Sequence, residues 1–297
     1  MNIIILTAVP FPIGMAGTNR ILSYSKGIVE LGNSVEVICL KPTEREYGII
    51  RNQAVKGQYN GIKYEYVSGT TIWPEAGKKK FKKLLYILKG LLNSIRLIKK
   101  INNLERVDCL LLYSNSFYNI VFFYFVSRFL KIRYIQERND IFNKESSVGK
   151  FCENHIHKLF DGMIIETNTL IKYFKPRLRK SAKIARVPMT VEPERFINNK
   201  IKIHESSRYI TYCGNMRNND GVSILIDAFK IVSEKFKDAK LYIIGDTSDI
   251  LEYKKLKQQV NNLRLYDRVI FTGRINRGEI PKYLCNSTIL ALASPTS

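Results

Sequence analysis

A strand, a glycine, a polar turn and a helix start follow one another in residues 208–221, RYITYCGNMRNNDG. The first of these residues are β-branched and aromatic, which predicts a strand, and Gly221 opens an amphipathic pattern, which predicts a helix. Gly214 permits close approach of the backbone to a ligand, and the turn carries the cation Arg217 beside Asn219. Because a helix N-terminus presents free N–H groups to anions, this order of residues predicts a phosphate site.

Strand and helix patterns alternate along the rest of the chain. Residues 3–9 are continuously apolar, as expected of a strand covered on both faces, and the loop that follows contains Gly14 and Gly17. Thr18 or Asn19 is placed to cap the next helix. Helices are predicted between most of the strands, one of them at 148–160, and further strands at 35–40, 62–67, 107–113, 132–137, 162–166, 183–187, 208–213, 239–245, 268–272 and 288–293. The alternation predicts an α/β protein with doubly wound parallel sheets, whose ligands bind beyond the carboxyl ends of the strands.

The length of 297 residues predicts two domains. A segment around residues 188–207 contains two prolines and few apolar residues, which is typical of a linker. We place an N-terminal domain at 1–190, the linker at 191–207 and a partial C-terminal domain at 208–297. The second domain is expected to be incomplete, because the alternation stops after residue 293 within a β–α unit.

The charge balance is strongly basic. Lys and Arg number 48 against 26 Asp and Glu, which gives a net charge of +22. Such an excess predicts an anionic partner: nucleic acid, a lipid headgroup surface or a phosphorylated ligand. We expect no nucleic acid partner, because the sequence contains no recognisable binding module and most tyrosines fall in predicted strands and helices.

The cysteines and the apolar runs bear on the compartment. The five cysteines are widely spaced, and buried thiols in a reducing compartment are the simplest interpretation. The N-terminus has no basic region before its apolar run, and the longest apolar run, 117–126, is too short to span a bilayer. These features predict a cytoplasmic protein. Three histidines without a cysteine pair predict no metal site, since His155 and His157 are two apart and do not share a helix face.

A cationic helix is predicted at residues 78–100, where no acidic residue occurs. An apolar stripe recurs at helical spacing in Phe81, Leu84, Leu88, Leu91, Ile95 and Ile98, with Lys82, Lys89, Arg96 and Lys100 on the opposite side. Such a helix suits an anionic membrane surface and predicts a peripheral position on the inner face of a membrane. The alternative is that the stripe packs on the sheet while the lysines are solvated, since a packed stripe cannot also enter lipid.

The order and spacing of several segments resemble glycosyltransferase family 4, whose members use nucleotide-sugar donors. These segments are PFPIGMAGTNR, VPMTVEPERF, YCGNMRNNDGVSILIDAFK, LYIIGD and YDRVIFTGRINRGEIPKYLCNSTILALAS. The resemblance implies the GT-B fold of two Rossmann-like domains and a retaining transfer of a sugar. It implies no cofactor beyond a UDP- or GDP-linked donor substrate. The implied acceptor is a saccharide or a lipid-linked molecule in surface polysaccharide or glycoconjugate biosynthesis.

The resemblance also implies roles for individual residues. In this family diphosphate is the leaving group, so cations and helix dipoles near it stabilise charge in the transition state. The implied donor-binding positions are Gly14, Gly17, Gly214, Arg217, Asn219, Gly273, Arg274 and Ile275. The family usually has an Arg after the loop glycine and a Lys before the helix, which leaves Arg217 as the only cation of this loop. Its paired-glutamate signature is expected beyond the end of the chain.

The catalytic centre departs from the family as well. Many relatives place a histidine after the strand that matches residues 133–136, whereas this chain has Glu137 and Asn139 as catalytic candidates. Glu137 could position an acceptor hydroxyl or support charge. The alternative is a strand-end carboxylate paired with Arg138 or with a loop amide. At the level of the whole protein, the alternative to an enzyme is a truncated, non-catalytic remnant that binds a membrane surface or a partner protein.

Overall fold

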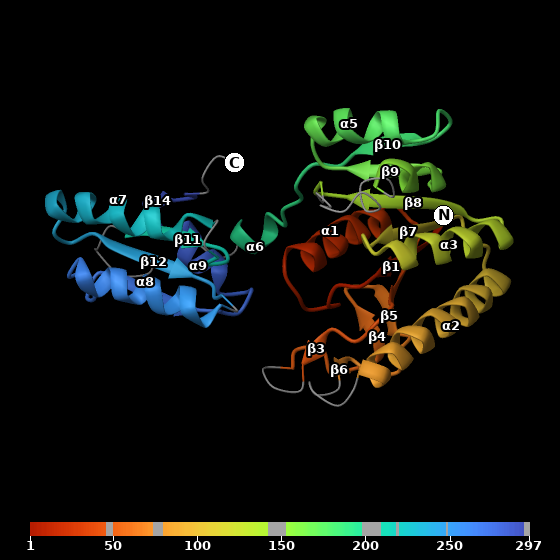
Figure 1. Ribbon diagram of the computed structural model, residues 1–297, viewed down its shortest axis with the longest axis horizontal. Coiled ribbons are helices and arrows are strands. Elements are labelled where there is room, and N and C mark those ends of the chain that lie inside the picture. Colours follow the sequence, from red (N-terminus) through yellow and green to blue (C-terminus); the bar gives the residue numbers. More distant parts are fainter. Residues whose placement is uncertain are drawn as a thin grey trace. The chain divides into compact units, whose positions relative to one another are not determined.

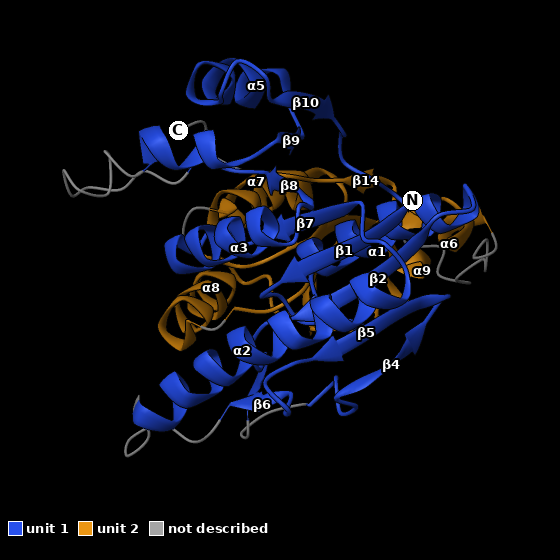
Figure 2. Ribbon diagram, turned by 90° about the vertical axis from the view of Figure 1, so that its right-hand side faces the viewer, with its two compact units in different colours: residues 1–191 blue, residues 192–297 orange. Residues whose placement is uncertain are grey.

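The structure is a computed structural model, which describes residues 1–45, 50–73, 80–141, 153–197, 209–217, 220–247 and 249–293. The chain divides into two compact units, residues 1–191 and 192–297 (Figures 1 and 2). Each unit is built on a parallel sheet covered by helices, so the predicted α/β class with two parallel-sheet units is confirmed.

Unit 1 contains an eight-stranded sheet in the order β10-β9-β8-β7-β1-β2-β5-β4. All neighbouring strands are parallel except β4 and β5, which are antiparallel. A separate parallel pair is formed by β3 (Glu44–Arg45) and β6 (Ile72–Trp73). The strands of the large sheet are β1 (Asn2–Thr7), β2 (Ser34–Cys39), β4 (Lys56–Tyr59), β5 (Ile62–Tyr66), β7 (Cys109–Tyr113), β8 (Arg133–Arg138), β9 (Gly162–Ile165) and β10 (Lys183–Arg186).

Two apolar clusters cover the two faces of this sheet. Ile4 and Leu6 of β1 belong to one cluster and Ile5 to the other, because successive side chains of a strand point to opposite faces. Helices α2 (Lys80–Leu104) and α3 (Phe117–Phe129), which lie in front of the sheet in Figure 2, pack on the first cluster, and α1 (Ala16–Glu30) packs on the second. The continuous apolar run at the start of the chain was therefore correctly interpreted as a doubly covered strand.

The start of α1 differs from the prediction. The residue at the N-cap is Met15, and neither Thr18 nor Asn19 caps the helix. Both lie within its first turns, and the Thr18 hydroxyl donates to the carbonyl of Pro10 at 2.5 Å. Gly14 lies against Thr18, where a Cβ would overlap that hydroxyl. The hydroxyl therefore closes the loop before the helix instead of bonding the helix N-terminus.

The end of unit 1 holds shorter elements. They are a 3-10 helix η1 (Ile156–Leu159), helix α5 (Asn168–Phe174), capped by Thr167, and a 3-10 helix η2 (Lys175–Arg177). The helix predicted at 148–160 lies partly outside the described residues; residues 153–155 are helical and continue into the 3-10 turn η1.

Unit 2 contains a four-stranded parallel sheet in the order β13-β12-β11-β14. Its strands are β11 (Tyr209–Cys213), β12 (Lys240–Ile244), β13 (Val269–Gly273) and β14 (Ile289–Leu290), and the last is shorter than the predicted strand at 288–293. Its helices are α6 (Glu194–Ile197), α7 (Val222–Lys235), α8 (Ile250–Asn262) and α9 (Ile280–Cys285). Helix α6 falls within the segment expected to be a linker, and residues 198–208 lie outside the described residues.

Two further expectations need correction. Cys39 and Cys109 are buried free thiols, as expected, but Cys213 and Cys285 are exposed, and Cys152 lies outside the described residues. The apolar stripe of α2 is only partly packed: Ile98 is buried, while Phe81, Leu84 and Leu88 are about half exposed or more. None of the helices in the described ranges is both long and apolar enough to cross a membrane.

Candidate functional site

A polar pocket lies at the carboxyl edge of the unit 1 sheet. The chain first adds β2 to the sheet on one side of β1 and later returns to add β7 on the other side of β1. The order in which strands follow one another in the sheet therefore reverses between β1 and β7. Ligands of open α/β sheets bind at the carboxyl ends of the strands at such a point. A pocket of about 300 Å³ occupies this position and is lined by Ala8, Val9, Tyr113, Ser114, Asn115, Glu137, Asn139 and Asp140. Glu137 and Asn139, the predicted catalytic residues, therefore share one pocket.

Glu137 forms a buried ion pair in the wall of this pocket. Its carboxylate accepts from the Nε of Arg20, which projects from α1, and both side chains are almost completely buried. The Arg20 guanidinium also donates to the carbonyls of Val187 at 2.6 Å and Pro188 at 2.8 Å. The alternative interpretation of Glu137 as a paired strand-end carboxylate was right in kind but wrong in partner, because Arg138 pairs with Glu153 instead.

The ionisation of Glu137 reflects two opposing effects. Burial raises the pKa of the Glu137 carboxyl, and the Arg20 guanidinium that contacts it acts in the opposite direction. Tyr24 of α1 lies close to the same carboxyl, and burial, followed by the Glu137 charge, raises the pKa of the Tyr24 hydroxyl. The Glu137 carboxylate thus contributes to the pocket wall, and side chains of α1 hold it in place.

Tyr113 connects Asn139 with the start of α1. The Asn139 amide nitrogen lies 3.1 Å from the Tyr113 hydroxyl, and a Cβ on Gly17 would lie 3.0 Å from the same hydroxyl. Burial, followed by the Glu137 charge, raises the pKa of Tyr113 to about 12, so the phenol is neutral at physiological pH. The other polar atom of the Asn139 amide is buried without a hydrogen-bond partner in the described part of the chain. Since buried polar groups are normally satisfied, the missing partner of this atom distinguishes Asn139 from an ordinary structural amide.

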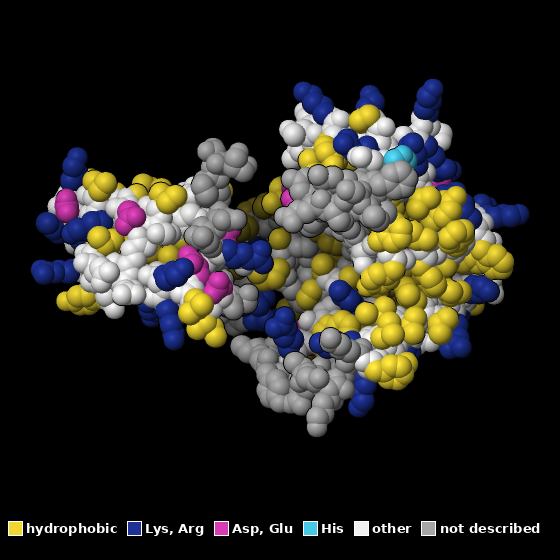
Figure 3. Space-filling model, in the orientation of Figure 1, with side chains coloured by type: hydrophobic (Ala, Val, Ile, Leu, Met, Phe, Trp, Pro, Cys, Tyr) yellow, Lys and Arg dark blue, Asp and Glu magenta, His cyan; other side chains and the backbone are white. Residues whose placement is uncertain are grey.

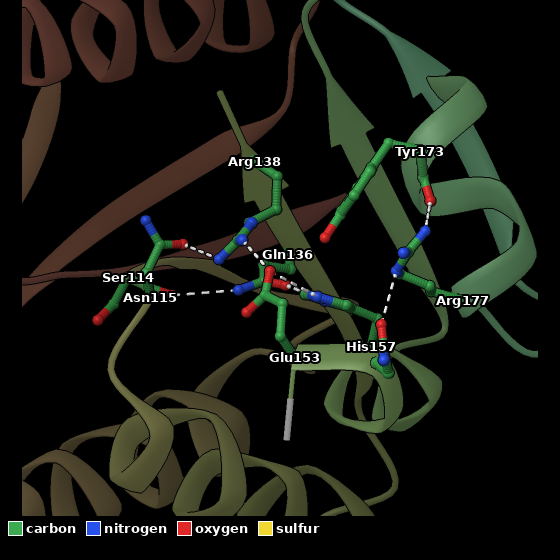
Figure 4. Close-up of polar contacts among 9 residues, drawn as sticks. Ser114, Asn115, Gln136, Arg138, Glu153, His157, Tyr173 and Arg177 are labelled. Carbon is green, nitrogen blue, oxygen red and sulfur yellow. Dashed lines mark hydrogen bonds and ion pairs between the residues drawn. The ribbon is translucent and has the colours of Figure 1, made fainter. Parts of the chain in front are cut away.

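A network of buried polar side chains holds the loop after β7 (Figure 4). Gln136 donates to the carbonyl of Ser114 at 3.2 Å, and Arg138 donates to the side-chain oxygen of Asn115 at 2.7 Å. Arg138 also donates to Glu153 at 2.5 Å. Because Ser114 and Asn115 line the pocket, this network holds that part of the pocket wall in position. The sequence did not indicate these roles, which depend on contacts between β7, β8 and the segment before η1.

His157 completes the network as a buried histidine. Its Nε2 lies 3.2 Å from the Glu153 carboxylate and its Nδ1 lies 3.4 Å from the Gln136 side-chain oxygen. Burial lowers the pKa of His157, and the charges of Arg138 and Arg177 lower it further against the opposing effect of Glu153. A neutral imidazole is therefore the form that the folded chain favours.

Replacing His157 by glutamine should change how stability depends on pH. Because the pKa of His157 is lower when folded, the unfolded chain binds more protons, and stability is lost as pH falls from about 6.5 through the lowered value. One proton contributes a slope of at most about 1.4 kcal/mol per pH unit. Urea unfolding at pH 7.5 and 5.5 should show a smaller loss for His157→Gln than for the natural chain. His155→Gln, at an exposed position, is the control. If the natural chain and His157→Gln lose the same free energy of unfolding between the two pH values, the prediction is wrong.

In unit 2 three neighbouring strands end in glycine. Gly214, Gly245 and Gly273 follow or close β11, β12 and β13, and their backbones are linked by bonds from Gly214 N to Ile244 O and from Gly245 N to Gly273 O, both 3.0 Å. A Cβ on Gly245 would overlap the Gly214 carbonyl oxygen. The ends of β11 and β12 can approach so closely only because Gly245 has no side chain. Gly245 was missed as a functional position, and its signal was the glycine that ends the strand LYIIGD.

The loop after Gly214 leads to the N-terminus of α7. Gly221 occupies the N-cap in a left-handed conformation, with φ at 72°, and a Cβ there would overlap the carbonyl oxygen of Ala293. Arg217 is exposed, and its backbone N–H donates to the Asp220 carboxylate at 2.8 Å. Asn219 lies outside the described residues. The N-terminus of α7 and the exposed Arg217 side chain thus both lie near the end of β11.

Three further implied donor-binding positions, residues 273–275, lie along the same edge, at the end of β13. Gly273 has a φ of 67°, followed by exposed Arg274 and half-buried Ile275. Since β12 separates β13 from β11, the two ends are roughly 10 Å apart by strand spacing. A nucleoside diphosphate is long enough to bridge them. No group of three His, Cys, Asp or Glu side chains that could hold a metal is found within the described ranges.

Comparisons with known proteins bear on the fold and on part of unit 2. Residues 193–296 match the family model of glycosyl transferases group 1, while no curated protein matches the chain by sequence. Sucrose-phosphate synthase from Thermosynechococcus elongatus aligns over 99% of this chain and 75% of its own, with 12% identity and a TM-score of 0.68. Anabaena HepE in complex with UDP-glucose aligns over 99% and 74%, with 14% identity and a TM-score of 0.65. A glycosyltransferase from Rickettsia africae aligns over 99% and 73%, with 16% identity and a TM-score of 0.63. These likenesses confirm the predicted GT-B fold.

Proposed function

We propose that this protein is a glycosyltransferase that moves a sugar from a nucleoside-diphosphate sugar to an acceptor. The observation that carries the proposal is the carboxyl edge of unit 2, where Gly214, Arg217 and the N-terminus of α7 lie together. This edge falls within the residues that match the family model of glycosyl transferases group 1. Because the similar protein HepE was crystallised in complex with UDP-glucose, UDP-glucose is the first donor to test.

The chemistry requires stabilisation of a leaving diphosphate. As the bond to the sugar breaks, negative charge grows on the diphosphate oxygens, and groups oriented toward them lower the barrier. The free N–H groups of α7 and the Arg217 guanidinium are suited to this role. Arg274 and Ile275 are proposed to contact the base of the nucleotide. The resemblance to family 4 implies that the configuration of the transferred sugar is retained.

The pocket of unit 1 is suited to a saccharide acceptor. Its polar lining combines Asn115, Asn139 and Asp140 with the paired carboxylate of Glu137. Hydroxyl groups are both donors and acceptors, and amides and carboxylates can satisfy both functions. Asn139 is proposed to bind an acceptor hydroxyl and Glu137 to fix the wall beside it. A lipid-linked saccharide would place the enzyme at a membrane surface.

Donor binding and turnover test the proposal directly. Calorimetric titration with UDP-, GDP- and ADP-sugars should show binding of at least one donor by the full chain. An assay for free nucleoside diphosphate should then show its release when a saccharide acceptor is added. A folded sample that binds none of these donors would overturn the proposal for this chain and favour the non-catalytic alternative.

Replacing Arg217 by alanine should weaken donor binding. A hydrogen bond to a charged group contributes about 1.5–3 kcal/mol, which corresponds to roughly a 10- to 100-fold higher Kd. Lys235→Ala is a matched control, because Lys235 is exposed in the last turn of α7, at the opposite edge of the sheet. Titration of both variants with the best donor should show the loss for Arg217→Ala alone. Equal affinities would contradict a role of Arg217 in phosphate binding.

A further inference from the structure

An apolar patch is exposed on the surface formed by α2 and α3. Figure 3 shows hydrophobic side chains gathered over these two helices. Six large side chains define this α2–α3 patch, each 46–75% exposed: Phe81, Leu84, Leu88, Leu92, Phe125 and Phe129. Soluble proteins rarely expose a contiguous apolar area of this kind unless it binds something. The patch therefore marks an interaction surface.

Helix α2 is apolar on two sides, which explains how it can pack and still expose the patch. Gly90, Ser94 and Ile98 recur every four residues and are buried. Gly90 lies so close to the sheet that a Cβ would overlap the carbonyl oxygen of Leu40. Phe81, Leu84 and the other patch residues of α2 lie on another side of the helix. The apolar side chains in the first turns of α2 therefore remain exposed when the helix packs on the sheet.

The patch continues from α2 to α3 without interruption. A groove of about 330 Å³ between the helices is lined by Ile95 and Lys99 of α2 and by Phe122, Phe125 and Phe129 of α3, among others. The Lys99 Nζ lies 5.1 Å from the centre of the Phe129 ring. The sequence pattern indicated only α2, and the contribution of α3 comes from the contact between the two helices.

The charges that α2 and α3 themselves carry are all of one sign. Helix α2 contains seven basic and no acidic residues, and α3 contains one basic residue, Arg128, and no acid. Lys82, Lys89 and Lys100 share one row along α2 with Arg96, within about 100° of the patch around the helix axis. An apolar stripe with cations on its flank is the arrangement of helices that lie in a membrane interface, with apolar side chains at the acyl boundary and cations among anionic headgroups.

We propose that the α2–α3 patch docks the protein on an anionic lipid bilayer. Phe81 and the two phenylalanines of α3 enter the interface, and the row of lysines contacts the headgroups. The charge complementarity favours a lipid surface over a protein groove, since a helix with seven basic and no acidic residues matches an extended anionic surface. This docking does not depend on glycosyl transfer, and its test is separate from the donor titration.

Vesicle binding of the full chain tests this docking. The chain should sediment with vesicles of phosphatidylcholine and phosphatidylglycerol, less with phosphatidylcholine alone, and less at high salt. The triple variant Lys82→Glu/Lys89→Glu/Lys100→Glu should bind the anionic vesicles roughly a hundredfold more weakly. Each basic residue near an anionic surface raises the affinity roughly fivefold, and three such residues are lost. The control Lys235→Glu/Lys237→Glu/Lys254→Glu has the same net charge but changes exposed lysines of unit 2, and it should retain most of the binding.

The apolar contribution is tested with Phe81→Ser/Phe125→Ser/Phe129→Ser, whose positions are exposed, against Ile231→Ser/Ile250→Ser at exposed positions of unit 2. Only the first should lose binding, and its circular dichroism should match that of the natural chain. Equal binding of all variants, or no preference for anionic vesicles, would overturn the proposal. Sedimentation velocity without lipid tests whether the patch instead binds a second copy of the chain. If the natural chain self-associates and does not bind vesicles, and the phenylalanine variant does not self-associate, the patch is a contact between two copies and lipid docking is overturned.

Discussion

Replacing Arg20 by methionine is expected to lower the free energy of unfolding by about 3–5 kcal/mol, the usual cost of removing one partner of a buried ion pair. Glu137 would remain buried beside the apolar core without its cation, and its pKa, already raised by burial, would rise further. The carbonyls of Val187 and Pro188 would also lose their donors. Arg20 thus joins α1, the pocket wall and the last residues of unit 1.

Urea unfolding and a double-mutant cycle can measure this effect. Arg20→Met/Glu137→Gln should recover part of the loss, because the unpaired charge is then absent. Arg128→Met is the matched control: Arg128 pairs with Asp161 at 2.7 Å but is 38% exposed, so its pair should contribute no more than about 1 kcal/mol. A similar small loss for Arg20→Met would show that the Arg20–Glu137 pair does not stabilise the fold.

Replacing Gly245 by alanine is expected to destabilise unit 2 and weaken donor binding. Gly245 has a φ of 130°, which L-residues rarely adopt, and its Cβ would overlap the Gly214 carbonyl oxygen. Backbone strain costs about 1–3 kcal/mol and overpacking a similar amount, so we expect a loss of about 2–6 kcal/mol. The clash displaces Gly214, which begins the proposed phosphate loop. Donor affinity should therefore fall even in samples that remain folded.

Gly278→Ala is the control for this substitution. Gly278 belongs to the same unit and does not adopt a positive φ, and a Cβ added there would meet nothing within 4 Å beyond its chain neighbours. Thermal unfolding and titration with the best donor should leave Gly278→Ala close to the natural chain and shift Gly245→Ala strongly. Unchanged stability of Gly245→Ala would show that the ends of β11 and β12 can separate without cost.

Much of the fold could be predicted from local patterns in the sequence. The run at the start of the chain is continuously apolar, which is typical of a central strand, and the structure places it there as β1. The glycine that ends β11 and the amphipathic start of α7 were likewise evident from neighbouring residues. These features succeed because strand and helix periods are properties of adjacent residues. The N-cap of α1 failed as a prediction because the Thr18 hydroxyl had another acceptor nearby, the Pro10 carbonyl.

The sequence by itself determined the α/β class, the order of most strands and helices, and the succession of strand, glycine, turn and helix around Gly214. Only the tertiary structure decided which side chains meet. Arg20 and Glu137 are 117 residues apart and pair because α1 crosses the end of β8, and α3 completes the apolar patch because it packs beside α2. Local periodicity contains no information on such contacts. They depend on how distant elements pack, and that packing gives Glu137 its partner and leaves one side of α2 exposed.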